Sequence, residues 1–279
     1  MPQPTSTVAS FGERAVAAGR ERGRLCVGID PHPHLLEAWG LTVDVDGLRT
    51  FTMTCVEAFA DTAAMVKPQV AFFERFGSRG FAVLEDALAA LREQGCLSLA
   101  DAKRGDIGST MAGYADAWLG ESSPLRADAV TVSPYLGVGA LNPVFDLAEA
   151  TGRGVFVLAA TSNPEAVALQ SLSVDGRSVA QRVVDELAER NTAAGAAVGA
   201  LGVVVGATLD TPPKLDQLNG PVLLPGVGAQ GATPDDVRTL TAAAPELGFA
   251  NVSRAILSHG PQVADLRESV ISTAAEFRD

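Results

Sequence analysis

The chain has 279 residues, a length that fits one α/β barrel of about 250 residues as well as two smaller domains. Hydrophobic residues make up 47% and aromatic residues only 5%, so a core would be filled mainly by alanine, valine and leucine. The formal net charge of −12 and the lack of a long basic run argue against nucleic-acid binding, which depends on clustered lysine and arginine.

The cysteines and the N-terminal segment exclude further classes of protein. Cys26, Cys55 and Cys96 are odd in number and widely spaced, with no CxxC pair, so neither a disulfide framework nor a zinc cluster is predicted. No basic segment followed by an apolar stretch opens the chain, and no apolar run is long enough to span a bilayer. We therefore expect a cytoplasmic protein that does not bind membranes.

Short aliphatic runs alternate with helix-like segments along the chain. A helix is expected near Ser10–Arg22, and eight strands follow, most of them separated by alanine-, leucine- and glutamate-rich segments with helical spacing. The expected strands are Leu25–Asp30, Met65–Val70, Leu97–Arg104, Ala129–Pro134, Gly154–Thr161, Leu201–Thr208, Pro221–Gly228 and Ala250–Ala255. This order predicts a single (β/α)8 TIM barrel, one catalytic domain over residues 1–279, with an extra N-terminal helix covering its bottom.

Charged residues gather where the third expected strand ends, the region that forms the active site in such barrels. Asp101 and Lys103 are two residues apart on a strand and point to the same face, into the barrel mouth. Lys67 would approach from an adjacent strand, and these charges are expected to pair because isolated buried charges are costly. Such an array can hold a lysine protonated beside a reactive carbon and deliver a proton to it. The alternative is a charge cluster that only fixes the barrel mouth.

A glycine-rich turn after the seventh expected strand suggests a phosphate site. Its backbone N–H groups would be exposed, and the ends of strands seven and eight form the usual phosphate pocket of these barrels. Gln230 adds an amide donor, and Arg254 adds a planar fork that suits phosphate oxygens. The alternative is an ordinary turn that needs glycine for a positive φ.

The segment Asp101–Ile107 resembles the DxKxxD signature of the orotidine 5'-phosphate decarboxylase superfamily, and its DAKRGDI sequence resembles the orotidylate branch. Further segments are similar to that family strand by strand over almost the whole chain. They are Gly28–Pro31, Lys67–Pro68, Thr161–Pro164 (typical of the longer bacterial subgroup, often called type 2), Val205–Thr208, Pro225–Gly231 and Ser253–Arg254. The family often has glycine where Ser253 stands.

The resemblance implies decarboxylation of orotidine 5'-phosphate to uridine monophosphate (UMP), the last step of de novo UMP synthesis, without a cofactor or metal. It implies that Lys103 protonates C6 of the pyrimidine, that Asp101 lies beside the departing carboxylate, and that Lys67 lies beside Asp101 and the ribose. It also implies a homodimer in which Asp106 and Thr110 enter the partner's site.

The resemblance assigns the remaining contacts to substrate binding. Asp30 should hold ribose hydroxyls and Ser133 should hydrogen-bond the base. Pro225, Gln230 and Ser253, together with Arg254, should contribute to the phosphate end of the site.

Two other functions remain open. One is a magnesium-dependent sugar-phosphate decarboxylase of the same superfamily, and the other is a non-catalytic nucleotide-binding barrel that acts as a sensor. No dinucleotide fingerprint is present, because Gly137–Gly139 lacks the later glycine of that motif. His32 and His34 form an H-x-H pair in a loop, but no third ligand has suitable spacing, so no metal site is predicted.

Overall fold

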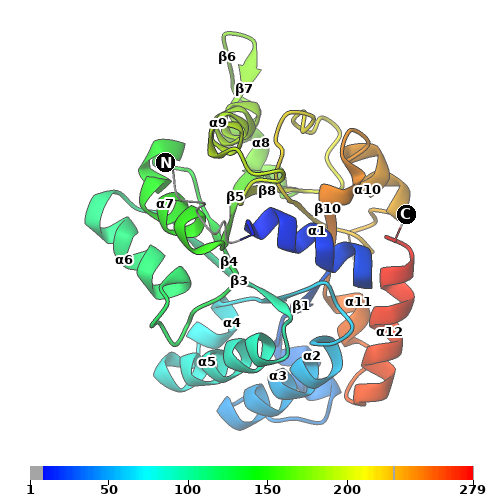
Figure 1. Cartoon of the computed structure of the whole chain (residues 1–279). Helices are drawn as coiled ribbons and strands as arrows, with labels where there is room; N and C mark the ends of the chain where they lie inside the picture. The colour runs from blue at the N-terminus through cyan, green and yellow to red at the C-terminus, as the bar shows by residue number, and fades with distance from the viewer. Residues whose placement is uncertain (1–8, 229, 279) are drawn as a thin grey trace, which may run out of the picture.

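The computed structural model describes residues 9–228 and 230–278, and these form a closed barrel of eight parallel strands. The strands follow one another around the barrel in the order β1-β10-β9-β8-β5-β4-β3-β2. Their bounds are β1 Leu25–Ile29, β2 Met65–Pro68, β3 Leu97–Arg104, β4 Ala129–Val132, β5 Gly154–Ala160, β8 Leu201–Val205, β9 Val222–Pro225 and β10 Gly248–Val252. The predicted (β/α)8 barrel is therefore confirmed, and Figure 1 shows the helices arranged around its outside.

Helices precede the first strand and occupy most of the crossovers. The α-helices are α1 Phe11–Arg22, α2 Pro33–Ala38, α3 Val45–Phe59, α4 Ala71–Glu74, α5 Gly77–Glu93, α6 Gly108–Leu119, α7 Asn142–Thr151, α8 Val167–Gln170, α9 Val179–Ala194, α10 Pro234–Leu240, α11 Arg254–Leu257 and α12 Val263–Ala275. Short 3-10 helices cover Val138–Leu141, Pro164–Ala166 and Pro245–Leu247. None of the helices in the described part of the chain combines the length and apolar character needed to cross a bilayer.

Helix α1 closes the N-terminal end of the barrel, as the sequence predicts, and Figure 1 shows it lying across the strands. It begins with a capping box: the Glu13 N–H donates to Ser10 Oγ at 3.1 Å, and the Ser10 N–H donates to Glu13 Oε2 at 2.9 Å. Phe11 is fully buried and packs edge-on against Phe156 of β5, with ring centroids 5.8 Å apart. Gly154 is needed there, because a Cβ on it would lie 2.3 Å from Phe11 Cδ1.

The core has two parts, inside and outside the barrel. The inner part combines side chains of the strands with those of α1, and includes Cys26, Met65, Leu99, Phe156, Val204, Leu223 and Phe249. The outer part lies between the strands and the surrounding helices, and includes Val27, Val66, Ala100, Val130, Val203 and Leu224. Alternate residues of each strand thus face opposite sides, so the next inward positions along the strands define the barrel mouth.

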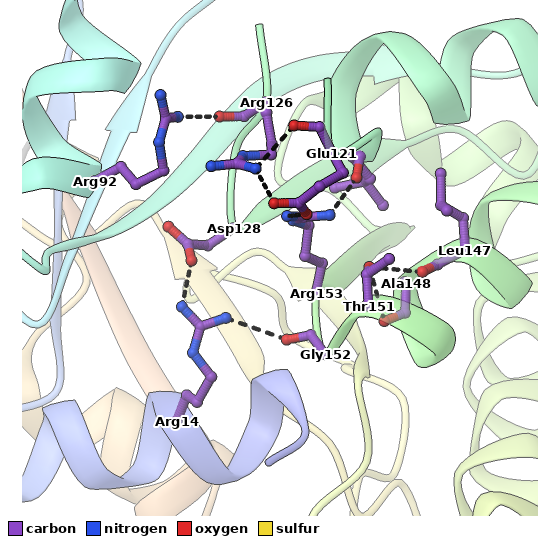
Figure 2. A network of polar contacts seen from close by, with 11 residues as sticks. Arg14, Arg92, Glu121, Arg126, Asp128, Leu147, Ala148, Thr151, Gly152 and Arg153 are labelled. Carbon is purple, nitrogen blue, oxygen red and sulfur yellow. Dashed lines mark hydrogen bonds and ion pairs between the residues drawn. The ribbon is translucent and has the colours of Figure 1, made fainter. Parts of the chain in front are cut away.

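A polar network fixes the closed end of the barrel (Figure 2). Arg14 of α1 forms an ion pair with Asp128 just before β4 and donates to the Gly152 carbonyl at 3.1 Å. The other Asp128 oxygen accepts hydrogen bonds from the Ser98 N–H and hydroxyl, both at 3.0 Å. Figure 2 also shows Glu121 between Arg126 and Arg153, and both arginines form ion pairs with it. The contacts of Asp128 with Arg14 and Ser98 join α1 to the beginnings of β3 and β4.

One strand has different bounds from those predicted, and two connections have features that the sequence analysis did not predict. The last strand spans Gly248–Val252 instead of Ala250–Ala255, because its pairing with β9 begins at Gly248 and α11 begins at Arg254. The crossover from β8 to β9 contains no helix in residues 206–221, where Pro212 and Pro213 remove two backbone donors. The β5–α9 connection carries a small hairpin, β6 Ser173–Val174 and β7 Arg177–Ser178, which projects from the barrel in Figure 1.

Candidate active site

A cavity of about 280 Å³ opens at the C-terminal ends of the barrel strands. Eight of the sequence-predicted site residues line it: Asp30, Lys67, Asp101, Lys103, Pro225, Gln230, Ser253 and Arg254. They come from β2, β3 and β9, from the position just after β1, from the turns after β9 and β10, and from the start of α11. The topology therefore brings together residues up to about 220 positions apart, as parallel strands of a closed barrel require.

Asp101 is the centre of the charged group in the cavity. Its Oδ1 lies 2.6 Å from Lys103 Nζ and its Oδ2 lies 3.0 Å from Lys67 Nζ. Lys67 Nζ is also 3.9 Å from Asp30 Oδ1. The side chains of Lys67 and Asp101 are 4% and 9% exposed, whereas that of Lys103 is 44% exposed and faces the cavity. Two of the three lysines in the chain thus meet at one buried carboxylate.

The electrostatics keep the buried pair charged. Burial alone would raise the pKa of Asp101, but the charges of Lys67 and Lys103 and their hydrogen bonds outweigh it and hold that pKa well below its ordinary value. Burial alone would lower the pKa of Lys67, but the carboxylates of Asp101 and Asp30 outweigh it and raise that pKa. Asp101 therefore stays ionised and Lys67 stays protonated at neutral pH.

Two uncharged side chains that the sequence did not reveal complete the environment of Asp101. Gln69, which follows β2, donates from Nε2 to Asp101 Oδ2 at 2.9 Å, and its Oε1 lies 3.5 Å from Lys103 Nζ. Thr131 of β4 donates its hydroxyl to Asp101 Oδ1 at 2.9 Å. Both line the cavity. Strand alternation could have placed them there, since each lies at an inward position of its strand, but neither belongs to a charged motif.

At the other side of the cavity, Arg254 is exposed and begins α11, and no hydrogen bond or ion pair joins its guanidinium to another described residue.

The turn after β9 differs from the expectation that it exposes several N–H groups. Four of its donors are used within the turn. The Gly228 N–H donates to the Ala232 carbonyl, and the Gly231 N–H donates to the Gly228 carbonyl. The N–H groups of Gln230 and Ala232 both donate to the Gly226 carbonyl. The side chains of Arg254 and Gln230 are therefore the main candidates to bind an anion here.

Glycine at two positions allows side chains to meet in the cavity. A Cβ on Gly28 would lie 1.9 Å from Ser253 Oγ, so β1 must lack a side chain there for Ser253 to fit. Gly226, with φ of 108°, lets the chain turn sharply after β9 and bring Gln230 back over the strand end. Gln230 Oε1 then accepts a hydrogen bond of 2.8 Å from Ser162 Oγ, which follows β5.

Three predicted site residues do not line this cavity: Asp106, Thr110 and Ser133. Asp106 is half-buried and accepts a hydrogen bond from the Ile107 N–H at 2.8 Å, while Thr110 lies exposed on α6. Ser133 packs beside Gly105, where a Cβ would lie 2.6 Å from the Ser133 carbonyl oxygen. Thr161, by contrast, lines the cavity although the sequence assigned it no role.

No metal centre emerges from the described residues, 9–228 and 230–278, because they contain no group of three or more histidine, cysteine, aspartate or glutamate side chains placed to hold an ion. His32 lies at the start of α2 with its ring against Phe72, centroids 4.3 Å apart. Burial lowers the pKa of His32.

The fold and the cavity define a class: a (β/α)8-barrel protein with a compensated lysine–aspartate site and an exposed arginine across the cavity from it. Comparison with known proteins narrows this class. Residues 23–269 match the family model described as "Orotidine 5'-phosphate decarboxylase / HUMPS family". The chain belongs to this family.

Relatives and solved structures agree with that assignment. The orotidine 5'-phosphate decarboxylase of Corynebacterium efficiens is 63% identical over 271 residues, which cover 96% of this chain and 97% of that protein. The orotidine 5'-phosphate decarboxylase of Corynebacterium glutamicum strain R is 60% identical over 271 residues, which cover 96% of this chain and 98% of that protein. A crystal structure from Streptomyces avermitilis, in which the same activity is assigned provisionally, is 51% identical, with a TM-score of 0.93, covering 100% of this chain and 98% of that one. The Leishmania donovani OMP decarboxylase structure has a TM-score of 0.74 at 29% identity, covering 96% and 97%.

Proposed function

We propose that this chain decarboxylates orotidine 5'-phosphate at C6 of the pyrimidine, giving UMP and carbon dioxide. The observation that carries the proposal is the placement of Lys103 Nζ, 2.6 Å from a buried Asp101 carboxylate and open to the cavity. The relatives with 60–63% identity that bear this activity support it.

The mechanism follows from the arrangement of charges. Arg254 and Gln230 bind the phosphate and Asp30 binds the ribose, so the orotate carboxylate is held towards Asp101. Binding energy from these groups, which are remote from the reacting bond, orients the substrate there. As carbon dioxide leaves, the Lys103 ammonium stabilises the negative charge that develops at C6 and then protonates that carbon.

Asp101 and Lys67 hold Lys103 in place for that step. The Asp101 carboxylate is fixed by Lys67 and stays ionised, because its pKa lies well below its ordinary value. An ammonium beside this carboxylate can donate a proton, and it lacks the free lone pair that Schiff-base chemistry needs. The proposal requires no cofactor and treats residues 1–279 as one cytoplasmic catalytic domain.

We also propose that the active form is a homodimer in which Asp106 and Thr110 enter the partner's site. An exposed apolar patch in the neighbouring β3–α6 and β4–α7 loops supports a second copy there: Ile107, Tyr135 and Leu136 are 62%, 78% and 54% exposed. Large apolar side chains grouped at such exposure are typical of an interface.

Mixing two inactive chains tests the shared site. Asp106→Ala and Lys103→Ala chains, unfolded together and refolded, form heterodimers in which one of the two sites is intact. About one quarter of parental activity should return at random association. Confirmed heterodimers without recovered activity would refute the shared site, and the two homodimers refolded separately are the control.

Ultraviolet-monitored turnover of orotidine 5'-phosphate, with and without excess chelator, tests the reaction itself. Conversion to UMP that is unaffected by chelator is the expected result. Loss of turnover in chelator would favour the magnesium-dependent sister activity. Tight UMP binding by folded protein without turnover would favour a nucleotide sensor.

A further inference from the structure

The hydroxyl of Thr131 links the two residues on which the proposed chemistry depends. Thr131 lies in the middle of β4 and is only 1% exposed. Its Oγ1 accepts a hydrogen bond of 2.9 Å from the Lys103 backbone N–H and donates one of 2.9 Å to Asp101 Oδ1. Because a hydroxyl has a single proton, its donation to Asp101 leaves it unable to donate to a bound substrate.

The backbone around Lys103 explains why such a link is needed. The register between β3 and β4 pairs Ala100 with Val130 and then Arg104 with Val132, so β3 advances four residues while β4 advances two. Within this bulge Lys103 has a φ of 48°, in the left-handed region that a non-glycine residue rarely adopts. A bulge next to an active site commonly serves to re-aim a side chain.

Thr131 provides an acceptor for a backbone donor that the bulge turns towards β4. Asp101, two residues before Lys103, bonds through its backbone to the other neighbour, because its carbonyl accepts a hydrogen bond from the Val70 N–H, whereas the Lys103 N–H bonds to the Thr131 side chain of β4. The regular pattern resumes immediately afterwards, where the Ser133 N–H donates to the Arg104 carbonyl at 2.8 Å. The hydroxyl therefore satisfies a donor that would otherwise be left without a partner close to the reacting groups.

We infer that Thr131 is a positioning residue for the decarboxylation: its hydroxyl fixes the Lys103 backbone and the Asp101 carboxylate relative to each other, so that Lys103 Nζ is directed at the reacting carbon. This inference rests on the proposed function. It assigns Thr131 an effect on the chemical step and none on the binding of the phosphate, which lies towards the β9 and β10 side of the cavity.

Thr131→Val tests the inference, because valine keeps the size and removes the hydroxyl. We expect kcat to fall by about tenfold to a hundredfold, the loss expected for a hydrogen bond to a charged group, while the Kd for UMP stays at the parental value. Thr131→Ser, which keeps the hydroxyl, should retain most of the parental kcat. Thr52→Val is the matched control, because Thr52 is fully buried on α3 and its Oγ1 has no hydrogen-bond partner among the described residues; its kcat should be unchanged.

Hydrogen exchange provides a readout that does not depend on turnover. The Lys103 amide should be protected in the parent and in Thr131→Ser, and should exchange faster in Thr131→Val and no faster in Thr52→Val. If valine prevents folding, Thr131→Cys takes its place, with a kcat expected between those of the parent and a variant without the hydroxyl.

The outcomes separate this inference from the proposed function. No turnover by the parent overturns the proposed function, and the exchange measurement still decides whether Thr131 holds the Lys103 amide. Parental turnover with an unchanged kcat in Thr131→Val overturns the positioning role alone. Equal losses of kcat and UMP affinity, or an equal loss of kcat in Thr131→Ser, also overturn it.

Discussion

Two aspartates at opposite ends of the barrel are held by similar contacts but have different roles. Asp128, at the closed end, forms an ion pair with Arg14 and accepts two hydrogen bonds from Ser98. Asp101, at the open end, is bonded by Lys67 and Lys103 and also by two uncharged side chains. Each carboxylate joins neighbouring elements of the barrel through compensated charge.

The difference lies in what the partners of each aspartate face. The Asp128 partners join α1 to β3 and β4, and none of these residues lines the 280 Å³ cavity. Around Asp101, Lys103 keeps 44% of its side chain exposed and lines the cavity beside Asp30. The same chemistry therefore stabilises the fold at one end, whereas at the other it presents a charged donor to a ligand. Activity and stability should respond differently to changes at the two ends.

Replacing Lys103 is expected to have the largest effect. Lys103→Ala should lower turnover by at least about 1,000-fold, since it removes the general acid and the charge that stabilises C6. The melting temperature should change little, because Asp101 keeps its bond to Lys67. Lys214→Ala removes the third lysine of the chain, which does not line the 280 Å³ cavity, and serves as the control in a turnover assay with thermal melting. Turnover within tenfold of the parent in Lys103→Ala would remove the proton-donor assignment.

Arg254 should affect binding more than chemistry. Arg254→Ala should weaken UMP binding by about 2–5 kcal/mol, the range seen when one partner of a desolvated charge pair is removed. Calorimetric titration with UMP measures this, and the KM for the substrate should rise in parallel. Arg20→Ala, which removes an exposed arginine of α1 at the closed end, should leave the Kd unchanged. An unchanged Kd in Arg254→Ala means that the phosphate binds elsewhere.

The sequence predicts the barrel well because its signals are local and repeated. Short aliphatic runs carry Asp30, Lys67 and Lys103 at or near their C-terminal ends and so place these residues at the mouth, and strand alternation puts Asp101 and Lys103 on one face. The boundaries are weaker where local pattern competes with pairing. Strand β10 begins at Gly248 because β9 pairs with it there, which the residues of β10 alone do not reveal.

The uncharged residues around the site were harder to predict than its charged residues. Thr131 and Gln69 are ordinary residues in sequence: Gln69 pairs with Asp101 beside the end of β2, and Thr131 bonds the Lys103 N–H within the bulge of β3. The bulge itself depends on a register shift between two strands, which no local motif encodes. The resemblance implies that Ser133 contacts the base, which stays a prediction; Ser133 is not among the residues that line the cavity, whereas Thr161 is.

The charge of Asp101 should appear in the pH dependence of stability. A carboxyl with a lowered pKa stabilises the folded state fully above its unfolded pKa, near its ordinary value of 3.8, and loses that contribution as pH falls towards the lower folded pKa. The parent should therefore exceed Asp101→Asn in free energy of unfolding by a constant amount from about pH 5 to 7, and by less below about pH 4. Urea unfolding at each pH measures the difference. The exposed Asp216 gives the control, Asp216→Asn, and a difference that does not shrink in acid contradicts the prediction.

Changes at the closed end should be the smallest and should leave activity intact. Asp128→Asn should lower the free energy of unfolding by about 1–2 kcal/mol, because it removes a partly exposed ion pair and weakens the hydrogen bonds from Ser98. The kcat should equal that of the parent. A double-mutant cycle with Arg14→Ala isolates the pair from the packing of Phe11 on Phe156. If the two changes are additive, aromatic packing and the capping box hold α1 across the barrel. If they are not, the ion pair contributes directly, and the same carboxylate–cation contact has a structural role at one end and a chemical role at the other.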